Sequence, residues 1–128
     1  MTTEPAIALP PDWRTRLQAW ASQDAELIEA ATWFDGAVLL ELGESVAWLK
    51  IYAGRVIDVR DSAAVFGYTF ALRGPAAVWQ VLLVDPHASV HQLVLLGKLR
   101  VDGNQLEFSR LSKLVAVLVR GLRAVRAS

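Results

Sequence analysis

The chain has no cysteine and only two histidines and one methionine among its 128 residues. Without cysteine it can form no disulfide framework, and thiol chemistry and thiolate metal ligation are excluded. The chain also lacks a long hydrophobic run. The longest uninterrupted apolar stretch is Leu114–Val119, whereas a membrane-spanning helix needs about 20 apolar residues. These absences argue against a disulfide-stabilised fold and against a transmembrane protein.

The first eleven residues lack the basic and apolar regions of a signal peptide, which predicts a cytoplasmic protein. We expect residues 1–11 to form a flexible N-terminal arm. Residues 12–128 are enough for one domain with a substantial core, and we expect them to form a single domain.

Apolar residues are abundant despite the missing membrane span. They make up 54% of the chain, and the mean hydropathy is +0.34, whereas ordinary globular domains have an apolar share of about 45–50%. The surplus is greatest in the last third of the chain. It favours contact with a partner, which could be a bound lipid, a second subunit in a homodimer, or a membrane surface touched transiently.

The net charge is zero, but the charges are segregated. Residues 98–128 hold seven basic and two acidic residues, a net charge of +5, and residues 1–97 hold six basic and eleven acidic residues, a net charge of −5. Two interpretations stay open: the cations complement the dipole of a terminal helix, or Arg120, Arg123 and Arg126 attract an anionic headgroup or a CoA-like phosphate. The pI near 6.7 and the lack of a recognition motif argue against nucleic acid as a partner.

The first half of the chain changes from helical to strand periodicity. Apolar residues at helical spacing predict helices over 13–21 and 27–31, and Asp35-Gly36 predicts a turn. Period-two runs at 37–42, 45–52 and 55–60, joined by two-residue links, predict an antiparallel meander. In the middle strand, Leu49 and Ile51 should face the core because the other face carries a lysine. By the same alternation, Ile57 and Val59 should face the core in the third strand.

The second half alternates strands and helices. The pattern predicts a strand over 68–73, a helix from Pro75 to residue 84, a short helix over 90–96 capped by Ser89, a strand over 97–102 and one long terminal helix. This order is typical of an α+β fold with one antiparallel-rich sheet and helices on one face.

The predicted terminal helix carries an unusually wide apolar arc. One continuous stripe follows helical spacing, and Val117 and Val119 lie off the stripe and widen the arc. This arc could be buried in the protein's own core or could contact a ligand. The stripe comprises Leu111, Leu114, Val115, Leu118, Leu122 and Val125.

No motif predicts a catalytic or metal site. His87 and His91 are four residues apart, but no third ligand is evident, so we predict no metal. Gly97-Lys98 lacks the other residues of a P-loop, and the glycine-rich and serine-hydrolase motifs are absent, so we predict no cofactor. The acids Glu41, Asp58, Asp102 and Glu107 lie mostly on predicted solvent faces.

Two segments resemble a known family. GKLRVDGN at residues 97–104 is similar to the pattern G-K-L-[KR]-[IV]-x-G-[ND] that precedes the last helix of the sterol carrier protein 2 (SCP2-like) family. FALRGP at residues 70–75, leading into a helix with Trp79, is similar to the family's strand-to-helix passage. Together with the meander, the resemblance covers residues 12–126. The C-terminus lacks a peroxisomal Ser-Lys-Leu address, which favours a bacterial protein.

The resemblance implies a five-stranded, mainly antiparallel sheet with helices packed on one face and an apolar tunnel between them. It implies a carrier or ligand-presenting protein for a fatty acyl chain, acyl-CoA, sterol or related lipid, with no shared catalytic residue. An enzyme on the same scaffold, acting on a lipid-, steroid- or polyketide-like substrate, and a dimerisation or docking module are the alternatives. The expected ligand-binding residues are Trp33, Leu49, Ile51, Ile57, Val59, Phe70, Trp79, Leu82, Leu96, Phe108, Leu111, Val115 and Leu118.

Overall fold

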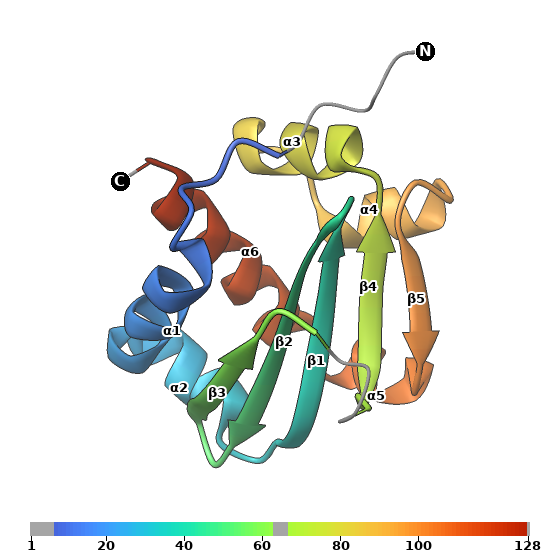
Figure 1. Ribbon diagram of the computed structural model, residues 1–128. Coiled ribbons are helices and arrows are strands. Elements are labelled where there is room, and N and C mark those ends of the chain that lie inside the picture. Colours follow the sequence, from blue (N-terminus) through green and yellow to red (C-terminus); the bar gives the residue numbers. More distant parts are fainter. Residues whose placement is uncertain (1–6, 63–66, 128) are drawn as a thin grey trace.

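The computed structural model describes residues 7–62 and 67–127. The described part is an α+β fold in which a five-stranded sheet carries helices on one face (Figure 1). Two helices come first, followed by a three-strand meander, and the second half alternates strands with helices. The elements are α1 Trp13–Gln23, α2 Ala25–Ala31, β1 Asp35–Leu42, β2 Ser45–Tyr52, β3 Arg55–Arg60, β4 Phe70–Gly74, α3 Ala76–Val84, α4 Val90–Leu95, β5 Arg100–Gly103, α5 Gln105–Arg110 and α6 Ser112–Ala127.

The sheet has the strand order β3-β2-β1-β4-β5. All neighbouring strands are antiparallel except β1 and β4, which run parallel. The predicted mainly antiparallel sheet is therefore confirmed. The parallel pair forms because β4 joins the meander at its open edge beside β1 and runs in the same direction as β1.

Two boundaries differ from the sequence prediction because of tight packing and turn geometry. Asp35 and Gly36 belong to β1 rather than to a turn. A side chain at position 36 would collide with Phe34 and Thr69, so this glycine permits a close approach. The last strand begins at Arg100 rather than at Gly97, because Gly97 has a φ of +73° and the Lys98 and Leu99 amides donate to the Leu93 carbonyl.

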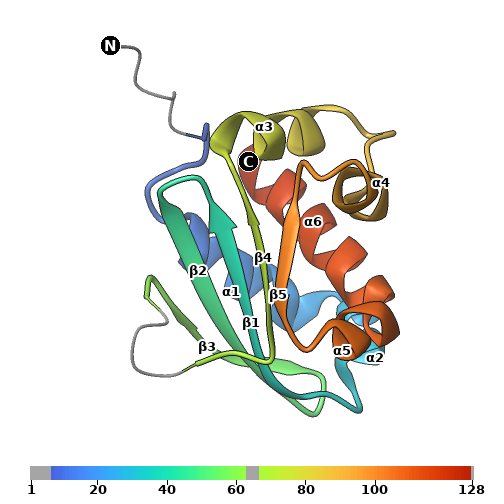
Figure 2. The same ribbon diagram turned by 90° about the vertical axis from the view of Figure 1, so that its right-hand side faces the viewer.

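The predicted single terminal helix is two helices. The backbone leaves helical geometry at Leu111, which has φ −100° and ψ 26°. The break turns α5 at an angle to α6 (Figure 2). It lets Phe108 pack edge-on against Phe70, with 5.5 Å between the ring centroids, while α6 continues across the molecule.

The wide apolar arc of α6 is buried in the protein's own core. All six residues of the predicted stripe are buried, and so are Val117 and Val119 beside it. The arc is covered because α6 lies between α1 and α2 on one side and α3 on the other, above the inner face of the sheet. The apolar surplus therefore does not lie on this helix.

In β2, the predicted core face is confirmed: Ala47, Leu49 and Ile51 are fully buried. In β3 the prediction for Ile57 is wrong. A register shift opposite Lys50 and Ile51 pairs Ile51 with Val56, so Val56 takes the core position and Ile57 is 54% exposed. A β-bulge of this kind reverses the alternation on one side of the extra residue. Val59, beyond the bulge, again packs against the core.

The described end of the predicted N-terminal arm packs against the domain. Ile7 is buried in the core, and the Ala8 amide donates to the Gln80 side chain at 3.3 Å. Residues 1–6 of the predicted arm lie outside the described residues. Within residues 7–62 and 67–127, no helix combines the length and apolarity needed to cross a bilayer.

The bulge makes a testable prediction about stability. Val56→Ala removes buried methyl groups and should lower the free energy of unfolding by about 2 kcal/mol, whereas Ile57→Ala should change it by about 0.5 kcal/mol or less. Urea denaturation followed by circular dichroism measures both. The reverse order would contradict the register of β2 and β3.

Candidate functional site

An apolar cavity lies between α6 and the segment that joins α3 to α4. Its volume is about 130 Å³. Leu82 of α3 and Val115 of α6 form its inner wall, and residues of α4 close it on the other side. Its lining residues are Leu82, Ala88, Ser89, Val90, His91, Ser112, Val115, Ala116, Val119 and Arg123. We call it the α4 cavity.

Local sequence explains why α4 closes this cavity. Asp85 and Pro86 end α3, and the Ser89 side chain then accepts a hydrogen bond from the Gln92 amide at 3.2 Å, which starts α4. α4 has six residues, and two of them, Val90 and Leu93, are buried. The helix is therefore attached to the domain through a small apolar contact.

Arg123 of α6 links the two walls of the cavity. Its guanidinium donates to the carbonyl of Leu82 at 2.8 Å and to those of Asp85 and Ala88 at 3.2 Å. These carbonyls lie at the end of α3 and in the connection to α4, where a positive charge also complements the helix dipole. Arg123 thus holds the α3–α4 connection against α6.

The other two cations of the predicted anion-attracting flank behave differently. Arg120 forms an ion pair with Asp24 at 2.8 Å and lies over the Trp20 ring. Arg126 is exposed in the last turn of α6. The three arginines therefore form no single headgroup site, and Arg123 alone of the three lines the α4 cavity.

Neither histidine belongs to a cluster of potential metal ligands within residues 7–62 and 67–127. His91 is exposed at the cavity rim, and its ring lies 5.8 Å from that of Phe108, measured between centroids. The His87 backbone amide donates to Asp85 at 2.9 Å. The part of the chain that the structure describes contains no cluster of histidine and acidic side chains suited to a metal ion.

The thirteen expected ligand-binding residues divide into two groups. Three lie on the surface: Trp33, Ile57 and Leu96 are 88%, 54% and 62% exposed. Leu82 and Val115 line the α4 cavity. The other eight belong to the core between sheet and helices; these are Leu49, Ile51, Val59, Phe70, Trp79, Phe108, Leu111 and Leu118.

The α6 wall of the cavity also contains Ser112, Ala116 and Val119, which are not among the expected ligand-binding residues, and Arg123, which was expected only to attract an anionic headgroup. Ser112, Val115, Ala116, Val119 and Arg123 recur at intervals of three, four, seven and eleven positions, which places them on one helix face. This second stripe shares Val115 with the leucine-rich one and is the sequence signal that could have identified the cavity wall. Because Ser112, Ala116 and Arg123 are small or polar, the sequence pattern of this stripe resembles that of a solvent-exposed helix face.

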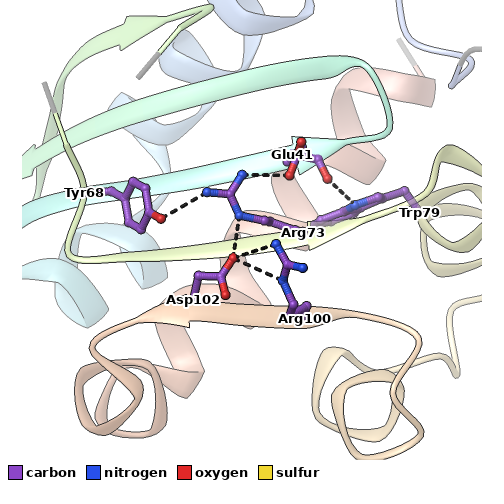
Figure 3. A network of polar contacts seen from close by, with 6 residues as sticks. All are labelled: Glu41, Tyr68, Arg73, Trp79, Arg100 and Asp102. Atoms are coloured by element: carbon purple, nitrogen blue, oxygen red, sulfur yellow. Dashed lines mark hydrogen bonds and ion pairs between the residues drawn. The ribbon is translucent and has the colours of Figure 1, made fainter. Parts of the chain in front are cut away.

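A second cluster of functional side-chain types lies on the opposite, outer face of the sheet (Figure 3). Arg73 of β4 donates to Glu41 of β1 at 2.8 Å, to Asp102 of β5 at 2.7 Å and to the Tyr68 hydroxyl at 3.0 Å. Arg100 also donates to Asp102 at 3.0 Å. An open hollow of about 460 Å³ lies beside this network.

The pKa shifts of Arg73 and Asp102 indicate that this network stabilises the fold. Hydrogen bonds, first from Arg73 to Glu41 and then to Tyr68, raise the pKa of Arg73 further above its ordinary value. Desolvation tends to raise the pKa of Asp102, but hydrogen bonds from Arg73 and Arg100 outweigh it and lower that pKa. Both groups therefore hold fixed charges near neutral pH, and Arg73 joins three strands through ion pairs. Asp58 pairs with Arg60 and Glu107 with Arg110 in the same manner.

A larger hollow of about 620 Å³ lies between α1, α2 and the β2–β3 hairpin. Its lining mixes polar Gln18, Ser22 and Arg55 with apolar residues, among them Ile57. Compared with it, the α4 cavity is smaller but mainly apolar, and its inner wall is part of the core.

The fold is similar to those of several solved structures. A crystal structure of sterol carrier protein 2 has a TM-score of 0.77 at 15% identity, over 88% of this chain and 95% of that one. The chain has the sterol carrier protein 2 fold. A conserved hypothetical protein of Thermus thermophilus also has a TM-score of 0.77 at 15% identity, over 96% and 92% of the two chains.

A third structure with this fold is the SCP2 domain of UbiJ, described as a ubiquinone synthesis protein. Its TM-score is 0.59 at 16% identity, over 84% of this chain and 90% of that one. No family model and no curated protein matches the sequence. The resemblance drawn from the sequence is thus confirmed at the level of the fold.

The Arg73 network predicts a pH effect on stability. A carboxyl whose pKa is lower in the folded state stabilises the protein above its unfolded pKa, and the contribution is lost as the pH falls through the folded pKa. The free energy of unfolding should therefore fall below about pH 4, near the ordinary carboxyl pKa, and fall less steeply in Asp102→Asn. Urea denaturation at pH 5, 4 and 3 measures the slope. Equal slopes in both proteins would show that the network does not hold Asp102 charged.

Proposed function

We propose that this protein binds a hydrophobic small molecule, such as an acyl chain, a sterol or an isoprenoid compound, between its sheet and helices. It would act as a carrier or ligand-presenting protein. The observation that carries the proposal is the α4 cavity, an apolar space whose inner wall is the core and whose outer wall is a weakly attached helix. The fold shared with sterol carrier protein 2 supports it.

The size of the cavity determines what binding requires. At about 130 Å³ it is near the size of an engineered cavity that holds benzene, about 150 Å³, and below the range of about 300–1,000 Å³ typical of ligand pockets. A long acyl chain therefore needs α4 to move outward from α6. Such a movement would extend the cavity toward Leu82, Val115 and the core around them.

The expected affinity follows from apolar burial. Ten to fifteen methylenes at ~0.8 kcal/mol each give about 8–12 kcal/mol before costs. Ordering the ligand and displacing α4 take back a large part of this free energy, which leaves affinities in the micromolar range. Binding of this kind needs no polar motif, in agreement with the absence of a catalytic signature in the sequence.

The UbiJ comparison leaves the ligand class open between straight chains and ring-bearing isoprenoids. That protein is described as a ubiquinone synthesis protein. A ring at the cavity mouth would meet His91 and Ser112, which line the rim, while an apolar tail would extend inward past Val115. The same apolar interior suits both classes.

Blocking the cavity mouth tests the proposal. Ala116 is exposed and lines the cavity, so Ala116→Trp should fill the mouth without disturbing the core and weaken binding of cis-parinaric acid roughly tenfold or more. Ala124→Trp, also at an exposed position of α6, is the matched control and should bind like the wild type. Fluorescence titration measures both.

Two outcomes would contradict this placement. One is equal affinity in the wild type and both tryptophan variants. The other is unchanged binding in Ala116→Trp with loss of binding in Ile57→Arg, which would place the ligand in the hollow beside the β2–β3 hairpin.

Release of α4 can be tested through Arg123. Arg123→Gln weakens the link between α6 and the α3–α4 connection, so the α4 amides should exchange hydrogen about tenfold faster. Arg126→Gln, an exposed position on the same helix, should leave them unchanged. Hydrogen–deuterium exchange with mass spectrometry resolves the α4 peptides. Unchanged α4 exchange in Arg123→Gln would show that Arg123 does not hold this helix closed.

A further inference from the structure

Two adjacent leucines are highly exposed where α4 ends. Leu95 is 87% exposed and Leu96 is 62% exposed. Exposed side chains of this size are uncommon as neighbouring pairs, and together they form an apolar tip that the described residues do not cover. The tip lies at the edge of the molecule, where the chain turns from α4 toward β5 (Figure 2).

The charged residues next to the tip in the sequence are basic, although Glu44 lines the same open hollow as Lys98 and Arg100. No acidic residue lies between Asp85 and Asp102, whereas Lys98 and Arg100 lie two and four positions after Leu96. Lys98 is exposed and has no ion-pair partner within residues 7–62 and 67–127. Arg100 is exposed as well, although it shares Asp102 with Arg73. The tip therefore combines apolar side chains with a neighbouring positive charge.

This combination suits an anionic bilayer. Leucines lower their free energy by entering the boundary between headgroups and acyl chains, while nearby lysine and arginine are attracted to anionic headgroups. A bilayer also needs no shape complementarity, so two exposed leucines can enter it without the closely matched surface that a protein interface requires.

The position of the tip links it to the α4 cavity. Leu95 and Leu96 end the same short helix whose first residues, Val90 and His91, line that cavity. We infer that this tip, together with Lys98 beside it, docks the protein on anionic membranes. Docking would place α4, the movable wall of the cavity, at the bilayer. The second part rests on the proposed function; the docking itself does not.

Vesicle flotation with the full chain tests docking without any added ligand. The wild type should float with phosphatidylcholine vesicles containing about 30% phosphatidylglycerol, bind less to phosphatidylcholine alone, and bind less at high salt because salt screens the charges. Leu95→Ser combined with Leu96→Ser should lower the partition coefficient about tenfold or more. Leu106→Ser is the matched control, because Leu106 is 79% exposed on α5 at the other end of β5.

A label gives a second readout that does not depend on changing the tip. Since the chain has no cysteine, Gln92→Cys on α4 and Gln105→Cys on α5 can each carry a single environment-sensitive NBD group at an exposed position. On anionic vesicles the NBD emission should shift to the blue at position 92 and stay unchanged at position 105.

Three results would overturn the inference. They are flotation of the double leucine variant at the wild-type level, an equal loss in Leu106→Ser, and a blue shift at position 105 without one at position 92. Absence of binding to both vesicle types would also overturn it and would leave a protein partner for the tip. Because no ligand is present, these failures are independent of the cis-parinaric acid titration.

Discussion

The packing of α6 onto the inner face of the sheet is the contact on which the rest of the structure depends. Its buried residues join α1, α2 and α3 to the strands in one continuous core. The fit is close at Gly121, where an added Cβ would lie 2.6 Å from the Trp20 ring and 3.0 Å from Leu17. The α4 cavity lies along the edge of this helix, between α6 and the connection from α3 to α4.

The outer face of the sheet is held together by polar side-chain contacts, whereas the inner face carries a weakly attached helix. On the outer face, Arg73 joins β1, β4 and β5 through Glu41 and Asp102, and Trp48 donates to the Gly67 carbonyl at 2.6 Å. These fixed polar links resist strand separation. On the inner face, α4 is attached through Val90, Leu93 and the Arg123 hydrogen bonds to the connection before it. A rigid sheet with one weakly attached helix is an arrangement that can admit an apolar ligand without unfolding.

The sequence predicted most of the fold because its signals were local and repeated. Alternation placed Leu49 and Ile51 in the core, and helical spacing identified the stripe from Leu111 to Val125. The failures have non-local causes. Ile57 is exposed because a bulge in the β2–β3 pair reversed its face, and no single-strand pattern contains that information. The break at Leu111 brings Phe108 against Phe70, a residue far away in the sequence, and helical spacing alone does not contain that contact.

The candidate site was harder to predict than the fold. The expected ligand-binding residues were all apolar and mostly large, yet Trp33 and Leu96 lie on the surface, while Ala116 and Arg123 line the α4 cavity. A cavity exists where side chains are small or turn away, so its walls are enriched in residues that a search for apolar mass overlooks. The surplus of apolar residues suggested a partner. The structure places exposed apolar side chains at surface positions such as Leu95, whereas the apolar arc of α6 is buried.

We propose that the apolar interior beside α6 accepts one hydrophobic molecule per chain. Native mass spectrometry of the purified protein, before and after incubation with palmitic acid, tests it most directly. We expect one lipid-sized adduct per chain, either copurified or acquired on incubation. A protein that stays empty across a range of fatty acids, sterols and isoprenoids would contradict it.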